Sequence, residues 1–185
     1  MTFDSKPKTG SLLVASPTLL DLNFSRTVVL LCAHDAEGTM GLVLNRPSSF
    51  ALSDVLVGVP PSASEKVFWG GPVDQNRFIV LQRSADTTLE TTSIAEDIQF
   101  GREEDFLHDL MEGHPRSQYR MFAGYAGWGE GQLQEELDQC GWLIAPTVAS
   151  LVFDTPPDKM WATAIQSLGP EYAHLASMPL DPRVN

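Results

Sequence analysis

The stretch that decides the fold runs from Phe122 to Pro157 and reads FAGYAGWGEGQLQEELDQCGWLIAPTVASLVFDTPP. Its first part is rich in glycine and carries Tyr125 and Trp128 between the glycines, which are Gly124, Gly127, Gly129 and Gly131. Glycine is favoured where the backbone needs a positive φ or a close approach to another segment. The two aromatic side chains need packing partners, so the pattern predicts a tightly folded loop rather than a flexible linker.

The residues after the glycines predict a short helix. Leu133, Leu137 and Cys140 recur at the spacing of one helix face, and Gly141 provides a C-terminal stop. The acidic residues off that face are expected in solvent; they are Glu135, Glu136 and Asp138. A helix with one apolar face is therefore expected to pack on the rest of the domain.

Two strands and a further helix are expected next. Trp142–Ala145 reads as a short buried strand that ends at Pro146, and Ser150–Phe153 reads as another. Thr155–Pro156 resembles an N-cap followed by a proline at the first helical position. The apolar face of this helix continues until Gly169–Pro170 stops it.

A glycine-rich loop that leads into a helix can hold an anion on its free N–H groups. No Lys-Ser or Lys-Thr pair follows the glycines, as a P-loop requires, and their G-x-G-x-G order differs from the dinucleotide-binding fingerprint. Glu130 occupies the place of a phosphate and would repel it. The pattern favours a tight strand-to-helix turn, and contact with a ligand stays open as the alternative.

Strands dominate the first half of the chain. They are expected at Leu12–Ala15, Thr27–Ala33, Met40–Leu44, Val67–Trp69, Phe78–Leu81 and Gln118–Ala123. Ala51–Val57 predicts a short helix, Glu103–Glu112 predicts a longer one, and Ile94–Ile98 fits either type of element. Hairpin-like runs therefore precede the first strong helix, and strands and helices alternate afterwards.

This order predicts an α+β fold: a single compact domain with a large mixed, partly antiparallel sheet and helices packed around it. The length of 185 residues fits one domain. Residues 1–9 are expected to form a disordered N-terminal tail, and residues 10–185 the single domain.

Composition argues against several classes of partner. The net charge is −12, and the basic residues are scattered, so direct nucleic-acid binding is not expected. No apolar run approaches the roughly 20 residues of a membrane span. The N-terminus lacks the apolar core of a signal peptide, and the two cysteines, Cys32 and Cys140, are expected as free thiols in a reducing cytoplasm.

Four blocks together resemble the AlgH/YqgE family of bacterial proteins: D-x-N-F-x-R, G-x-x-G-L-V-x-N-R-P, G-G-P-V and G-Y-A-G-W-x-x-G-Q-L. The similarity extends from about Gly10 to about Gly169. It implies a compact α+β fold with a large mixed sheet. Some members are named as transcriptional regulators of alginate synthesis, and no mechanism comes with that name.

The chain departs from the family pattern in two places. Gln82 stands where the family often has a histidine, so chemistry that depends on that histidine is not expected here. The family often ends near a Gly-His-Ala tail, whereas this chain ends in MPLDPRVN, residues 178–185.

The predicted ligand-binding residues are Asn45, Arg46, Gly70, Gly71, Trp128 and Gly129. Asn45 and Arg46 directly follow an apolar strand, which places an amide and a guanidinium at a strand end, where an arginine can bind a carboxylate or phosphate. The alternative is a structural salt bridge, and Arg26 has the same ambiguity. We expect the segments at 45–47, 70–72 and 127–129 to converge on one side of the sheet.

No catalytic residue, metal or cofactor is predicted. Cys32 lies in an apolar strand and reads as a buried inert thiol, and the four histidines show no metal-ligand spacing. The favoured hypothesis is a non-enzymatic binding or regulatory protein that acts through a protein partner or a small polar ligand. The alternatives are a cryptic enzyme on a small polar or phosphorylated ligand, and a nucleic-acid-associated regulator.

Overall fold

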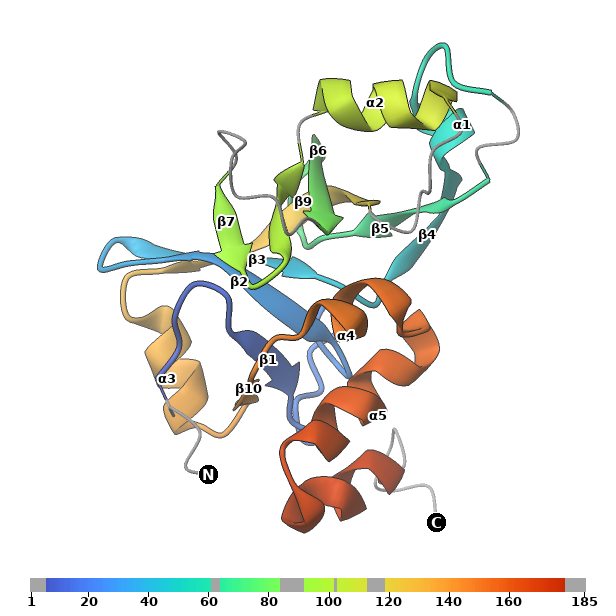
Figure 1. Cartoon of the computed structure of the whole chain (residues 1–185). Coiled ribbons are helices and arrows are strands. Elements are labelled where there is room, and N and C mark those ends of the chain that lie inside the picture. The colour runs from blue at the N-terminus through green and yellow to red at the C-terminus, as the bar shows by residue number, and fades with distance from the viewer. Residues whose placement is uncertain (1–5, 61–63, 84–91, 102, 113–118, 179–185) are drawn as a thin grey trace.

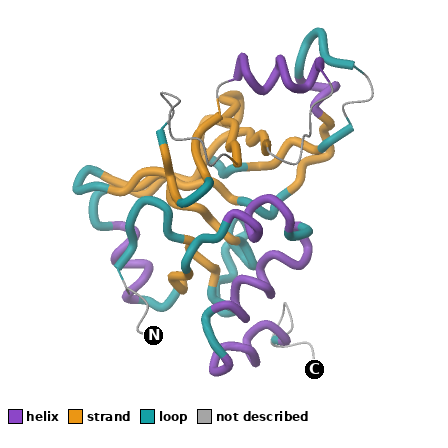
Figure 2. Tube along the Cα trace, viewed as in Figure 1, coloured by secondary structure: helices purple, strands orange, loops and turns teal. Residues whose placement is uncertain are grey.

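The computed structural model describes residues 6–60, 64–83, 92–101, 103–112 and 119–178. A large curled sheet forms its centre, and helices flank both faces (Figure 1, Figure 2). The strands are β1 (Leu12–Ala15), β2 (Val28–His34), β3 (Gly38–Val43), β4 (Pro47–Ala51), β5 (Lys66–Trp69), β6 (Val73–Arg83), β7 (Ser93–Ala95), β8 (Ile98–Gly101), β9 (Tyr119–Gly129) and β10 (Trp142–Ala145). The helices are α1 (Leu52–Val55), α2 (Glu103–Glu112), α3 (Gln132–Asp138), α4 (Ala149–Asp154), α5 (Pro157–Ser167) and the 3-10 helix η2 (Pro170–Ser177).

The sheet is mixed, as predicted. Its main path is β10-β1-β2-β3-β9-β6-β8-β7, and β5 pairs in parallel with β9 and antiparallel with β4. The other strand pairs described are antiparallel. The curl brings β7 back toward the start of β1: a Cβ at Gly10 would lie 2.4 Å from the carbonyl oxygen of Ile94.

Alternating side chains divide the core between the two faces of the sheet. On one face, Leu12, Leu30 and Phe122 pack against α4 and α5. On the other face, one cluster around Trp128 and Trp142 packs with α3, and a second cluster around Met121 packs with α1 and α2. The sheet thus has a buried layer on each side, and the helices of the second face leave a gap between α3 and α2 (Figure 1).

The glycine-rich stretch is a strand, not the predicted loop. β9 continues to Gly129, and only Gly131 lies in the turn before α3. Gly124 interrupts the strand with a φ of 71°, and a Cβ there would lie 2.7 Å from the Val73 carbonyl oxygen. This bulge shifts the side-chain alternation, so Met121 and Trp128 face the same side although one has an odd and the other an even number.

Two further sequence predictions need correction, and one ambiguous segment is resolved. Ser150–Phe153 belongs to helix α4: β10 is an edge strand that ends at Ala145, before Pro146, and the following apolar run packs as a buried helix. The ambiguous segment Ile94–Ile98 forms the hairpin of β7 and β8. Cys140 is exposed, with a φ of 58°, because it lies in the turn after α3 rather than on its apolar face.

Several predictions fall partly outside the described residues. Of the expected tail at 1–9, residues 1–5 lie outside, whereas the Lys8 carbonyl oxygen accepts a 2.9 Å hydrogen bond from the Ser11 amide. Gln118 and residues 179–185 also lie outside. Within the described helices, none has both the length and the apolar character needed to cross a membrane.

Candidate functional site

Backbone pairing brings the strand end at Asn45–Arg46 next to the turn at Gly70–Gly71. The Trp69 amide donates to the Arg46 carbonyl oxygen at 2.8 Å, and the Val43 amide donates to the Gly70 carbonyl oxygen at 2.8 Å. Both glycines are required by the close approach of the bulge in β9: a Cβ at Gly70 would lie 2.2 Å from the Gly124 carbonyl oxygen, and one at Gly71 would lie 2.1 Å from the Tyr125 carbonyl carbon.

Arg46 stands between two cavities. The first, here called the Trp69 cavity, has a volume of about 240 Å³ and is lined by Leu22, Asn23, Val43, Arg46, Trp69, Gly71, Pro72 and Gln75. The second, here called the Trp161 cavity, has a volume of about 740 Å³ and is lined by Leu20, Leu22, Ser25, Arg26, Asn45, Arg46, Pro157, Asp158, Trp161, Ala162 and Ala176. Arg46 and Leu22 line both, so we call the pair of cavities the Arg46 site.

The guanidinium of Arg46 is only partly engaged. Its Nη2 donates a 2.7 Å hydrogen bond to the Ser25 carbonyl oxygen. Among the residues that the structure describes, no carboxylate forms an ion pair with it, so the structural salt bridge considered above is not found there. The half-buried cation therefore anchors the loop before β2 with one nitrogen and keeps other N–H donors for a further acceptor.

Asn45 holds the same loop more completely. Its Oδ1 accepts a 3.0 Å hydrogen bond from the Val28 amide, and its Nδ2 donates at 2.9 Å to the Arg26 carbonyl oxygen. Both ends of the amide are thus engaged with backbone. This arrangement fixes the loop at residues 24–28 and makes Asn45 part of the frame of the site.

Arg26 closes the far end of the Trp161 cavity. Its backbone has a φ of 54°, and its guanidinium carbon lies 4.5 Å from the centroid of the Trp161 ring. Its Nη2 also donates to the Met178 carbonyl oxygen. Arg26 is therefore tied to α5 and to the end of η2, and it contributes positive charge to the cavity at a fixed position.

Trp128 and Gly129 do not line either cavity of the Arg46 site. Trp128 pairs with Thr39 near the start of β3, whereas Arg46 follows the end of that strand. Its indole is buried, stacks on Phe24 at 5.9 Å between ring centroids, and donates from Nε1 to Glu136. Of the three segments expected to converge, the structure brings two together and places the third beyond Phe24 on the same face of the sheet.

The sequence analysis placed Glu136 in solvent, and the structure contradicts this prediction. Its Oε2 accepts hydrogen bonds from the indole nitrogens of Trp128 at 3.0 Å and Trp142 at 2.8 Å. The carboxylate therefore faces the core under α3. The helix periodicity of Leu133 and Leu137 could not reveal this, because the partner indoles lie on two separate strands.

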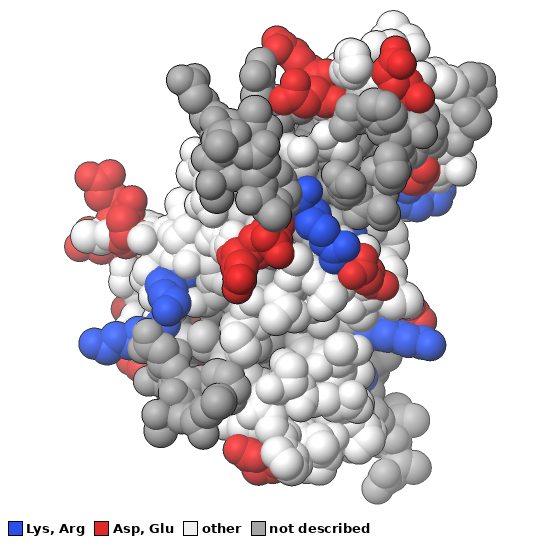
Figure 3. Space-filling view, in the orientation of Figure 1, with Lys and Arg blue, Asp and Glu red and all other residues white. Residues whose placement is uncertain are grey.

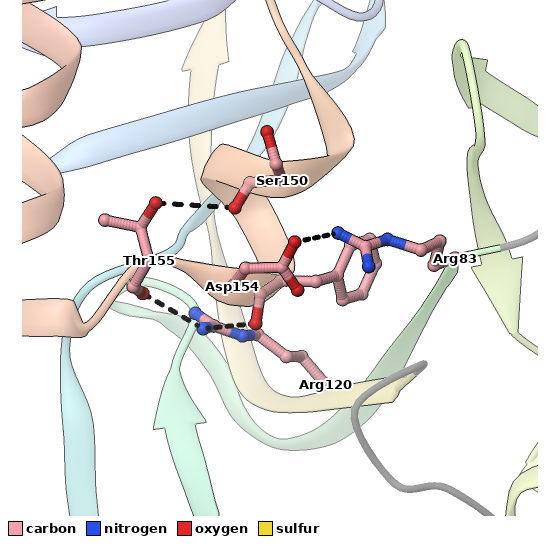
Figure 4. A network of polar contacts seen from close by, with 6 residues as sticks. Arg83, Arg120, Ser150, Asp154 and Thr155 are labelled. Carbon is pink, nitrogen blue, oxygen red and sulfur yellow. Dashed lines mark hydrogen bonds and ion pairs between the residues drawn. The ribbon is translucent and has the colours of Figure 1, made fainter.

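A second arginine network joins β6, β9 and α4 (Figure 4). Arg120 donates to the carbonyl oxygens of Leu44, Phe153 and Thr155, and its guanidinium carbon lies 4.8 Å from the centroid of Phe68. Burial lowers the pKa of Arg120 to about 10, opposed by the negative charge of Asp154. Arg120 therefore keeps its charge at neutral pH.

Asp154 instead pairs directly with Arg83, whose Nη2 lies 2.7 Å from the carboxylate (Figure 4). The network locks the end of α4 to the sheet, and its members are engaged with one another. Sequence reasoning missed it, although a lone arginine between Tyr119 and Met121 in an apolar strand was an available signal. Gln82, the departure from the family pattern, donates to the Tyr119 hydroxyl at 3.2 Å.

The predicted buried thiol is found as expected. Cys32 is 4% exposed, and both cysteines are free. Burial raises the pKa of the Cys32 thiol from 9.0 to about 12, with a smaller opposing effect of a hydrogen bond from the Leu42 backbone. Within the described ranges, no group of three or more His, Cys, Asp and Glu side chains is placed to hold a metal ion.

These features define an α+β protein whose curled sheet carries an arginine-flanked cleft at the end of a central strand. The chain belongs to the AlgH-like family, whose model matches residues 12–173. A UPF0301 protein of Chlorobium limicola is 33% identical over 97% of this chain and 97% of its own length, and one of Idiomarina loihiensis is 37% identical over 85% and 89%.

Two solved structures support the same assignment. The solution structure of the AlgH protein from Pseudomonas aeruginosa matches with a TM-score of 0.74 and 32% identity, covering 97% of this chain and 98% of that one. A crystal structure of a protein from Corynebacterium diphtheriae matches with a TM-score of 0.77 and 23% identity, covering 96% and 100%, and shows the shared fold. The resemblance to the AlgH/YqgE family is confirmed.

Proposed function

We propose that this protein is a non-enzymatic binding protein with a regulatory role, and that it takes a small anionic ligand, a carboxylate or a phosphate, at the Arg46 site. The observation that carries the proposal is the state of Arg46: a half-buried guanidinium between two cavities, with one backbone hydrogen bond and no ion pair among the described residues. A charge-assisted, bidentate hydrogen bond to an oxyanion is the interaction that this group makes best.

The surroundings of Arg46 suit such a ligand. In a chain of net charge −12, Arg46 forms no ion pair among the described residues, although Asp158 lines the Trp161 cavity with it, so its charge is open to an anion. Leu22 is 92% exposed and lines both cavities, so it adds apolar surface between them. The ligand would gain both charge recognition and apolar contact.

An enzyme acting on the same ligand receives less support. An active site built from the predicted residues would need Trp128 beside Arg46 in one cleft, and Trp128 is instead held by Glu136 in the core beneath α3. The Cys32 thiol is buried, and its pKa of about 12 disfavours a thiolate nucleophile. Binding without chemistry is the reading that these positions favour.

A role in transcription, which the family name suggests, would act through the ligand or a protein partner rather than through direct contact with DNA. Figure 3 displays the Lys and Arg residues of one face as separate spots with acidic residues between them. A gel-shift titration with duplex DNA at physiological salt is expected to give no complex tighter than about 10⁻⁴ M. A salt-sensitive, sub-micromolar complex would overturn this part of the proposal.

Anion binding is tested by nuclear magnetic resonance titration of the whole chain with inorganic phosphate and, separately, with acetate. The amide of Gly71 and the indole N–H of Trp69 report on the Trp69 cavity, and the indole N–H of Trp161 reports on the Trp161 cavity. At least one anion is expected to shift these signals with saturation. The Arg46→Gln variant should lose the response, and Lys66→Gln, which removes an equal charge at the exposed first residue of strand β5, should keep it.

The outcomes of the anion titration either support or contradict the Arg46 site. Saturable shifts that vanish only in Arg46→Gln support the proposed site. Shifts that persist in Arg46→Gln, or no response to either anion at concentrations up to tens of millimolar, would contradict it.

A further inference from the structure

A third cavity shares none of its described lining residues with the Arg46 site. It has a volume of about 360 Å³ and is lined by Ala33, Met40, Arg77, Phe78, Ile79, Val80, Phe100, Gly101 and Met121. We call it the Phe78 cavity. The volume falls in the range of about 300–1,000 Å³ that is typical of small-molecule sites.

The lining of the Phe78 cavity combines an arginine with apolar side chains. Among the described residues that line the cavity, Arg77 is the only charged one, and the others have apolar side chains or are glycine. Two phenylalanines supply flat walls, and two methionines supply flexible, polarisable ones that adapt to an irregular ligand. Such a lining accepts the hydrocarbon part of a ligand and offers one fixed place for a negative charge.

The local backbone explains why an aromatic side chain and an arginine stand together here. β6 leaves its pairing with β9 after the Val73–Tyr125 pair and resumes it at the Phe78–Ala123 pair. The residues between them bulge out of the ladder, and Asp74 there has a φ of 48°. A bulge of this kind redirects side chains at the edge of a site, and it sets Arg77 and Phe78 side by side at the cavity.

Neither Arg77 nor Phe78 has a side-chain hydrogen bond, ion pair or ring contact with the residues that the structure describes. Phe78 is 37% exposed although it lies in a strand of the central sheet. Arg77 is exposed, and it makes no hydrogen bond or ion pair within the described part of the chain. An open apolar surface next to an unpaired cation matches a ligand that has an apolar body and one anionic group.

We propose that the Phe78 cavity is a second ligand site, and that it takes an apolar carboxylic acid. The hydrocarbon chain or ring of the acid lies against Phe78, Phe100, Met40 and Met121, and the carboxylate pairs with the guanidinium of Arg77. Apolar burial supplies most of the affinity, and the charge-assisted hydrogen bond supplies the selection for an acid over a neutral compound.

The test uses three probes with the full chain: octanoate, octan-1-ol as its uncharged counterpart, and acetate as the head group alone. Binding is followed by the methyl resonances of ¹³C-methyl methionine. Met40 and Met121 line the cavity and should shift, whereas Met111, which is 59% exposed on α2, serves as an internal control. Octanoate is expected to bind at least about tenfold more tightly than octan-1-ol, and acetate should leave both resonances unchanged.

Variants separate this site from the Arg46 site. Arg77→Gln should weaken octanoate at least about tenfold and change octan-1-ol binding less than about twofold, because only the charge contact is lost. Ala33→Trp places a large side chain in the cavity from an exposed position on β2, and it should weaken both probes. Lys66→Gln controls for the loss of one positive charge.

Three results would overturn the proposal. The first is equal affinity for octanoate and octan-1-ol, which would mean that no acid is recognised. The second is an octanoate affinity that falls in Arg46→Gln and not in Arg77→Gln, which would place the acid at the Arg46 site. The third is no shift of Met40 or Met121 with octanoate at millimolar concentrations.

Discussion

The indole nitrogen of Trp128 donates a 3.0 Å hydrogen bond to Oε2 of Glu136, across the interface between the sheet and helix α3. The same oxygen accepts a 2.8 Å hydrogen bond from Trp142, on the edge strand β10. One carboxylate therefore joins the end of β9, the edge of the sheet and the only helix that covers this corner of the described structure. The relationship explains Trp128 as a structural residue without any appeal to a ligand.

The Glu136→Ala substitution should destabilise the protein by about 2–4 kcal/mol, because two buried indole N–H groups lose a charged acceptor. The matched control is Glu135→Ala, one position along the same helix but exposed, which should change the free energy of unfolding by less than about 0.5 kcal/mol. Urea denaturation followed by tryptophan fluorescence measures both. Equal costs for the two variants would show that the indole contacts contribute no stability.

The backbone conformation at Gly124 leads to a second prediction about stability. Its φ of 71° and the 2.7 Å approach of the Val73 carbonyl oxygen leave no room for a side chain. Gly124→Ala should therefore cost about 3 kcal/mol or more. Gly129→Ala is the control in the same strand, since a Cβ there meets nothing within 4 Å, and it should cost less than about 1 kcal/mol.

A second readout of Gly124→Ala tests whether Gly124 is a bulge that shapes the Arg46 site or only a crowded position in the strand. The carbonyl oxygen of Gly71 lies 2.8 Å from the Cβ that alanine would add, so the rim of the Arg46 site should move with it. Chemical-shift changes at Gly71 that accompany the loss of stability would support this view. Thermal denaturation curves that coincide for Gly124→Ala and Gly129→Ala would contradict it.

Local patterns in the sequence were sufficient for those elements whose partners lie nearby in the chain. The apolar run at residues 27–33 and the strand expected at residues 40–44 predicted the two strands of the β2–β3 hairpin, and helical patterns predicted α2 and α5. The proline signal also placed the start of α5 within two residues of Pro157. Each of these patterns reflects the burial of apolar side chains within one helix or strand.

The failures share a different cause. Gly124 is a bulge because Gly71, far away in the sequence, approaches β9. Glu136 is a core acceptor because two strands present their indoles to it. Neither contact produces a periodic pattern in the sequence. The cavities around Arg46 and beside Phe78 likewise arise where separate elements meet, so sequence reasoning could find Arg46 from its place after a strand but not Arg77 from a bulge.

The Cys32 thiol predicts a specific dependence of stability on alkaline pH. Its pKa in the folded state is raised to about 12 by burial, from a usual value of 9.0. Below pH 9 the thiol is protonated in both states, and its contribution is fully present; between pH 9 and pH 12 only the unfolded state ionises, so stability falls. At pH 10 the loss is about 1 kcal/mol.

The comparison that isolates this contribution is the difference between the wild-type protein and Cys32→Ala, each measured by urea denaturation at pH 8 and pH 10. The difference should shrink by about 1 kcal/mol over this interval, because alanine cannot ionise. Thiol labelling in native buffer gives a second readout: exposed Cys140 should react quickly and Cys32 slowly. Rapid labelling of Cys32, or a difference that does not depend on pH, would contradict the buried position.

Asn45 and Arg46 are adjacent in the sequence, and the structure predicts opposite consequences for their removal. Asn45→Ala leaves the buried Val28 amide and the Arg26 carbonyl without their hydrogen-bond partners, so it should cost about 2–3 kcal/mol. Arg46→Ala removes one bond to the Ser25 carbonyl from a half-buried side chain, and should cost about 1 kcal/mol or less. Urea denaturation of the two variants against the wild-type protein measures this contrast.

The response of the Gly71 amide to anions should disappear in Arg46→Ala, while the rest of the spectrum of this variant stays that of the folded protein. An Arg46→Ala variant that fails to fold would show instead that the guanidinium serves the fold, and that no ligand is needed to explain its place beside the cleft.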